Sequence, residues 1–281
     1  MFQFDFMQHA FIVGTIVSIM CGVIGVYVIA RNSSFIAHTF SHIGFSGSAF
    51  AVYMGFSPIN GFLLFTIASA LAIGQMGVKV FKREVSISVV LSVFLGLGLL
   101  FLSLSTKNAN SMTSLLFGNI LGISSNAVWQ ISLLSILVLL LLILGYKMLN
   151  FDSFDHVGAQ AAGLPIRFIS IGFLLLLAVA TTEASQMVGA LLVFTLMTTP
   201  AAAARNLTHS IGRMILISSL IALIGVWIGL VVGYYTNLPI SFLITAIEGL
   251  LYFISLGWKT LKERMKPIEA TTVESMNLGG K

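Results

Sequence analysis

Two histidines, His38 and His42, are the residues of this sequence best placed to do chemistry. They lie four residues apart, so on a helix both imidazoles project from one face, one turn apart. Two helical histidines at this spacing can share one metal ion, and neutral imidazole suits zinc, copper, iron and nickel. The alternative is a pair of histidines that only hydrogen-bond to neighbouring helices. The pattern lacks the glutamate of H-E-x-x-H, which disfavours a zinc protease.

Glu248 is the second candidate, because it is the one acidic residue deep within a long apolar run. Such a carboxylate can line a transport pathway, take up protons, or stay neutral and hydrogen-bonded. Gln75, Asn119 and Glu183 are weaker candidates, with structural or interfacial roles. No G-x-x-x-x-G-K-[ST] phosphate loop occurs, so the chain cannot hydrolyse ATP by that route. We therefore predict that the chain is not an enzyme.

The elements that carry these residues are apolar enough to lie in lipid. Of 281 residues, 58% are hydrophobic and only 8% are charged, and the mean hydropathy is +1.04. A soluble domain carries roughly a quarter charged residues, so lipid must replace water around much of this chain. The net charge of +5 does not indicate a nucleic-acid partner, because the basic residues form short clusters between apolar runs. The composition predicts an all-α polytopic membrane protein.

About 20 apolar residues cross the hydrocarbon layer as a helix. Nine segments meet this measure: 9–30, 34–55, 59–78, 86–105, 126–149, 167–183, 186–204, 211–235 and 239–258. Lysine and arginine concentrate in alternate connections and after the ninth segment, which places the N-terminus outside and the C-terminus in the cytoplasm. The count becomes eight if one segment is re-entrant. We expect the polar stretch around Glu183 to separate the sixth and seventh spans.

Two shorter segments do not fit a simple crossing. Residues 114–124 (SLLFGNILGIS) are apolar but too few to span, which suggests a half-helix or re-entrant element, with an interfacial helix as the alternative. Residues 152–165 begin with acidic side chains and end with Gly163 and Pro165, as a short helix does. We expect this helix to lie along the cytoplasmic membrane surface. The transmembrane domain then covers 1–266, and the polar tail 267–281 is expected to be flexible.

Four ordered blocks of sequence resemble the permease subunits of bacterial ABC importers for zinc, manganese and iron. The first block is 31–47 (RNSSFIAHTFSHIGFSG), where His42 matches the histidine of these permeases and His38 stands where they usually have aspartate. The others are 116–121 (LFGNIL), 188–192 (VGALL) with the following TPAA, and a block made of Phe154, Asp155, Ala159, Gln160, Gly163 and Pro165. The resemblance covers nearly the whole chain.

This resemblance implies a homodimeric permease in the bacterial cell membrane, with two cytoplasmic ATPase subunits and an extracellular metal-binding lipoprotein. It also implies that the helix at 152–165 couples to the ATPase and that His38 and His42 contact the metal. No cofactor is expected to stay bound; the cargo is a divalent metal, and ATP acts through the partner subunit. Because imidazole replaces a hard carboxylate at His38, we predict zinc first and manganese next.

Two functions from other classes remain as alternatives. A secondary metal transporter would work alone and use Glu248 as a proton-coupled group. A membrane-embedded metalloenzyme would use His38 and His42, but it also needs a third ligand and a general base at the same depth. A neighbouring gene for an ATPase would separate the permease from both alternatives.

Overall fold

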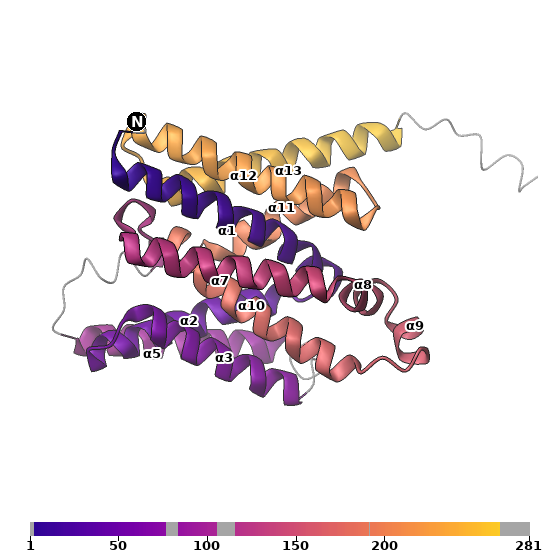
Figure 1. Cartoon of the computed structure of the whole chain (residues 1–281), viewed down its shortest axis with the longest axis horizontal. Helices are drawn as coiled ribbons and strands as arrows, with labels where there is room; N and C mark the ends of the chain where they lie inside the picture. The colour runs from indigo at the N-terminus through magenta and orange to yellow at the C-terminus, as the bar shows by residue number, and fades with distance from the viewer. Residues whose placement is uncertain (1–2, 77–83, 106–115, 191, 265–281) are drawn as a thin grey trace, which may run out of the picture.

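A computed structural model of the chain describes residues 3–76, 84–105, 116–190 and 192–264, and every regular element in these ranges is a helix (Figure 1). In chain order the elements are α1 (Asp5–Ala30), α2 (Ser34–Met54), α3 (Pro58–Met76), α5 (Glu84–Leu104), η1 (Ile120–Gly122), α7 (Ser125–Leu144), α8 (Tyr146–Phe154), α9 (His156–Ala161), α10 (Ile166–Val188), α11 (Val193–Leu207), α12 (Ile211–Thr236) and α13 (Ile240–Arg264). The prediction of an all-α polytopic membrane protein is confirmed.

Six of the described helices are long and apolar enough to cross a membrane: α1, α3, α7, α10, α12 and α13. The segments α2, α5 and α11 lie where the other three spans were expected. Of these, α11 has 15 residues, fewer than a bilayer crossing needs. The structure therefore places a helix at each of the nine expected positions, and six of them are convincing spans by length and composition.

The expected break around Glu183 is wrong. Helix α10 continues to Val188, so Glu183 lies within it, and the chain turns only at Gly189, whose φ is +84°. The threonines of this stretch do not interrupt the helix, because their hydroxyls find hydrogen-bond acceptors within it. The hydroxyls of Thr181 and Thr182 donate to backbone carbonyls of the preceding turn at 2.7 and 2.9 Å. Polar residues that indicated a connection are in fact part of a buried helix.

The helix expected over 152–165 is two helices. Helix α8 ends at Phe154, and Asp155, with φ −139° and ψ 73°, leaves the helical conformation and breaks the run. Its carboxylate then accepts a hydrogen bond of 2.9 Å from the Gly158 amide and caps α9. Gly163, with a φ of +73°, and Pro165 turn the chain into α10. Gly163 and Pro165 follow the end of the helical segment, as expected. The expected start at residue 152 lies instead within a separate helix, α8.

The described part of the short segment, 116–124, is helical at residues 116 and 117, and residues 114 and 115 of the expected half-helix lie outside the described residues. It contains the single 3₁₀ turn η1, where the Asn119 side chain accepts a hydrogen bond of 3.0 Å from Gly122. Ile120 is buried in the main hydrophobic core. Gly118 lies against Gly189 so closely that a Cβ on either would overlap the backbone of the other. The segment is therefore packed onto the end of α10.

The helices pack in two groups. In one, α2 lies against α3 and α5, and α3 lies against α10; in the other, α1, α11, α12 and α13 pack together. Helix α1 also contacts α7 and α10 and so joins the groups. In Figure 1, α8 and α9 lie at the same end of the bundle as the C-terminal end of α13, and the N-terminus lies at the opposite end. We call these the coupling end and the N-terminal end.

Candidate functional site

The structure brings His38 and His42 together on one face of α2, as their spacing predicts. Their ring centroids are 4.7 Å apart and the rings are nearly perpendicular, at 88°. His42 is buried, with 8% of its surface exposed, and His38 is half-buried. On the other side of His38 lies the Phe194 ring of α11, with a centroid distance of 5.1 Å. Two imidazoles so close can serve as neighbouring ligands of one ion.

Among the described residues, no hydrogen bond joins either imidazole to another side chain, and the buried Nδ1 of His38 has no partner. No group of three or more histidine, cysteine, aspartate or glutamate side chains forms a metal site within the described ranges.

The two acidic candidates lie deep inside the bundle, apart from the histidine pair. Glu248 on α13 is fully buried, and its side chain packs against Gly225 of α12. Glu183 on α10 is fully buried as well. Neither carboxylate has a hydrogen-bond partner among the described residues. A buried carboxylate without a partner is costly as an anion, so each is a candidate for a neutral acid or for a functional role.

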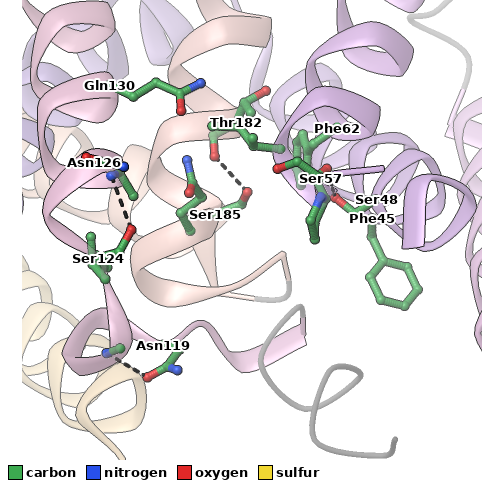
Figure 2. A pocket seen from close by; sticks show the side chains of 16 residues that line it. Phe45, Ser48, Ser57, Phe62, Asn119, Ser124, Asn126, Gln130, Thr182 and Ser185 are labelled. Atoms are coloured by element: carbon green, nitrogen blue, oxygen red, sulfur yellow. Dashed lines mark hydrogen bonds between the residues drawn. The ribbon is translucent and has the colours of Figure 1, made fainter. Parts of the chain in front are cut away.

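A cavity of about 480 Å³ lies at the N-terminal end of the bundle, between α7 on one side and α2 and α3 on the other, with α10 behind it (Figure 2). Its apolar lining comes from Phe45, Pro58, Ile59, Phe62, Gly122, Ile123 and Ala127. Its polar lining comes from Ser48, Ser57, Asn119, Ser124, Asn126, Gln130, Thr182, Ser185 and Gln186. None of these described lining residues carries a charge.

One lining residue, Thr182, meets a second hydroxyl group from a neighbouring helix. Thr182 lies 3.3 Å from the Thr66 hydroxyl of α3, and both side chains are fully buried. Phe45, which lines the cavity, follows His42 by three residues on α2, which is about one helical turn. The polar cavity and the histidines are therefore neighbours along the same helix.

Sequence reasoning missed this cavity, although its pattern is present. Asn126 and Gln130 are four residues apart on the otherwise apolar α7, and Thr182, Ser185 and Gln186 recur at helical spacing on α10. Amides and hydroxyls at such spacing share one face of a helix. Thr182 and Ser185 instead suggested a connection between two spans, which hid the helical spacing of the α10 residues.

At the coupling end, a half-buried arginine contacts residues of two helices besides the one it follows. Arg31 follows α1 and forms an ion pair with Asp152 of α8 over 2.5 Å, and its Nε donates to Ser153 at 2.8 Å. Its guanidinium also lies over the Phe173 ring of α10, 4.7 Å from the centroid. Burial lowers the pKa of Arg31, and the Asp152 charge opposes that shift. The three-residue connection from α1 to α2 is thereby held against α8.

The residues expected to contact an ATPase lie next to this arginine. Phe154, Gln160 and Gly163 are exposed, Pro165 caps α10, and Ala159 is fully buried beneath α9. Asp155 caps α9. Val157, at 78% exposure, adds a second exposed apolar side chain beside Phe154. The segment presents a small apolar surface at the end of the bundle.

Comparison with known proteins gives a consistent result. The ABC 3 transport family matches residues 3–259. The chain is similar to the manganese transport system membrane protein MntC of Listeria innocua, with 35% identity over 254 residues that cover 90% of each chain. It is also 30% identical to the manganese import system permease protein ScaB of Streptococcus gordonii, over 90% of this chain and 91% of that relative. A probable iron transport system membrane protein of Haemophilus influenzae is 26% identical, over 93% and 97%.

Two solved structures share the fold. PsaBC from Streptococcus pneumoniae in complex with Fab superposes with a TM-score of 0.81 and 28% identity, and the match covers 90% of this chain and 91% of that one. An inward-facing structure of a putative metal-chelate type ABC transporter gives a TM-score of 0.68 at 16% identity, over 89% and 85%. At that identity the second match concerns the fold alone.

Proposed function

This chain belongs to the ABC 3 transport family, and from that premise we propose that it is the membrane-spanning permease of an ABC importer for a divalent transition metal. The resemblance to permeases of metal ABC importers, seen in the sequence blocks, is confirmed by the family match and the named relatives. The observation that carries the proposal is the pair His38 and His42, whose rings face each other inside this fold. We assign the pair to contact the metal in transit.

We propose manganese as the first metal to test. Relatives at 35% and 30% identity are named as manganese transporters, and the expectation that zinc comes first finds no support among them. The imidazole of His38 still favours a softer ion, such as zinc, than a carboxylate at this position would. Discrimination between manganese and zinc is therefore the sharpest measurement on this chain.

Two cytoplasmic ATPase subunits, a permease dimer and an extracellular metal-binding lipoprotein complete the proposed importer. The coupling end supports this arrangement, because Phe154 and Val157 are exposed there and could enter a groove on an ATPase. Near the same end lie Arg31, Arg205 and Arg213, which is consistent with a cytoplasmic location. The N-terminal end, with its cavity, then faces the lipoprotein.

A movement of α9 would be transmitted to the histidines through few contacts. Arg31 links α8 to the connection between α1 and α2, and His38 lies about one turn into α2. A shift of the coupling segment would thus move the start of the helix that carries the pair. Switching between two access states requires such a two-state element.

The test is metal uptake by the permease–ATPase complex reconstituted in proteoliposomes. We expect His42→Ala to lower manganese uptake at least tenfold while the complex still assembles. His209→Ala is the matched control, because His209 is an exposed histidine outside the helices. Unchanged uptake in His42→Ala would remove the pair from the transport path.

Two further variants separate the finer proposals. His38→Asp should move the preference from zinc toward manganese, since it restores a hard oxygen ligand; an unchanged ratio contradicts that role. Glu248→Gln tests the secondary-transporter alternative. Uptake that needs no ATPase and is abolished by Glu248→Gln would replace the permease proposal.

A further inference from the structure

We propose that the cavity at the N-terminal end is a binding site for a hydrated divalent metal ion, which the permease holds with its water shell before the ion reaches the histidines. The inference rests on the proposed function, because it assigns that cavity to the metal path. It concerns a site separate from the histidine pair, lined by residues of α2, α3, α7 and α10.

The first argument is the chemistry of the lining. Polar side chains inside a membrane protein are costly, and here hydroxyls and amides gather on facing helices: Asn126 and Gln130 on α7, and Thr182, Ser185 and Gln186 on α10. Each offers an oxygen that accepts a hydrogen bond from a metal-bound water. No described lining residue is an anion or an imidazole that could displace those waters. The site is suited to the water shell of the ion.

The second argument is size. Six water molecules at about 30 Å³ each occupy about 180 Å³, and the cavity holds about 480 Å³. A six-coordinate aqua ion therefore fits with further water around it. Phe45 and Phe62, buried at 1% and 4% exposure, form apolar lining on the α2 and α3 side. The ion would thus be held mainly by the α7 and α10 walls.

The third argument is the place of the cavity in the fold. Its lining includes Phe45, which follows His42 by three residues on α2, and Thr182, whose hydroxyl lies beside that of Thr66. A neutral site binds weakly, so an ion can enter and leave quickly, as transport requires. The ion would exchange water for imidazole only at the next turn of α2. The cavity would then capture the hydrated ion, and the histidine pair would replace part of its water shell.

The experiment uses the double variant Asn126→Leu/Gln130→Leu in the reconstituted complex. Both side chains are exposed on the cavity wall, so folding should be preserved. We expect the KM for manganese uptake to rise about tenfold, with the maximal rate changed less than twofold. The matched control is Trp129→Leu, the residue between them, which is 77% exposed and does not line the cavity. An unchanged KM, or an equal rise in the control, overturns the proposal.

A binding measurement keeps the result independent of transport. Mn²⁺ is added to the His38→Ala/His42→Ala permease in uncharged phosphatidylcholine nanodiscs, and water-proton relaxation is recorded. Relaxation rises when a protein-bound Mn²⁺ keeps its water ligands, and we expect a rise that disappears when Asn126→Leu/Gln130→Leu is added. No rise, or a rise that survives those changes, contradicts the site. Loss of all metal uptake by the unaltered complex would instead contradict the proposed function.

Discussion

The two ends of the bundle are held together by different kinds of contact. At the N-terminal end, the backbone around Gly118 packs directly on the backbone at Gly189, both in positive-φ conformations, beside a cavity without charge. At the coupling end, the ion pair of Arg31 and Asp152 joins α8 to the chain that follows α1. Backbone packing has one geometry, whereas a charged side chain can follow its partner over a short movement. The difference suits one end to hold its shape and the other to transmit motion.

The largest expected effect comes from Gly189→Ala at the N-terminal end. Gly189 has φ +84° and ψ 160°, a region that other residues rarely adopt, and a Cβ there would overlap the backbone of residues 116–118. Strain and overlap together should lower the free energy of unfolding by about 4 kcal/mol. Unfolding by SDS in mixed micelles measures the loss.

The matched control is Gly163→Ala at the coupling end. Gly163 also has a positive φ, of +73°, but nothing lies within 4 Å of an added Cβ. Its cost should be only the backbone term, about 1–2 kcal/mol. Equal losses for the two variants would show that close packing does not distinguish the ends.

The next effect is Arg31→Ala, which removes the cation beside a buried carboxylate. The side chains of Arg31 and Asp152 are only 11% and 3% exposed, so the loss should be about 3 kcal/mol, near the lower limit for a broken buried pair. The same SDS unfolding measures it. Arg31→Lys keeps the charge but cannot reach Asp152, Ser153 and the Phe173 face with one planar group, so it should recover only part of the stability. Full recovery would show that charge alone matters.

In the transport assay, Arg31→Lys also tests coupling. We expect fewer manganese ions transported per ATP hydrolysed, because α8 is held less firmly to the connection before α2. Exposed Arg213 provides the control, and Arg213→Lys should leave the ratio unchanged. A normal ratio in Arg31→Lys would restrict the arginine to a structural role.

The smallest effect is Asp155→Ala, which removes the cap of α9. Loss of such a cap costs about 1 kcal/mol, equivalent to roughly fivefold weaker binding of the ATPase if α9 must be ordered to dock. Copurification or a direct titration of the ATPase measures this change. Asp155→Asn keeps the hydrogen-bond acceptor, so its affinity should stay near that of the unaltered chain. If Asn behaves like Ala, the charge and not the cap recruits the ATPase.

The amino-acid sequence by itself determined the membrane class, the all-α fold and the facing of His38 and His42. These follow from composition and helical periodicity, which act locally along the chain. It also indicated where the coupling segment stops, because Gly163 and Pro165 have fixed backbone preferences. The sequence blocks shared with metal permeases supplied the family.

Only the tertiary structure decided where polar residues of the spans end up. Thr182 and Glu183 resembled a connection, yet they lie within α10, because helix hydrogen bonds and neighbouring helices satisfy or bury what local composition would place in water. The cavity is lined by residues of α2, α3, α7 and α10, which lie far apart in sequence. The ion pair of Arg31 with Asp152 likewise joins residues 121 apart. Such contacts depend on the packing of several helices at once, and no local pattern specifies that packing.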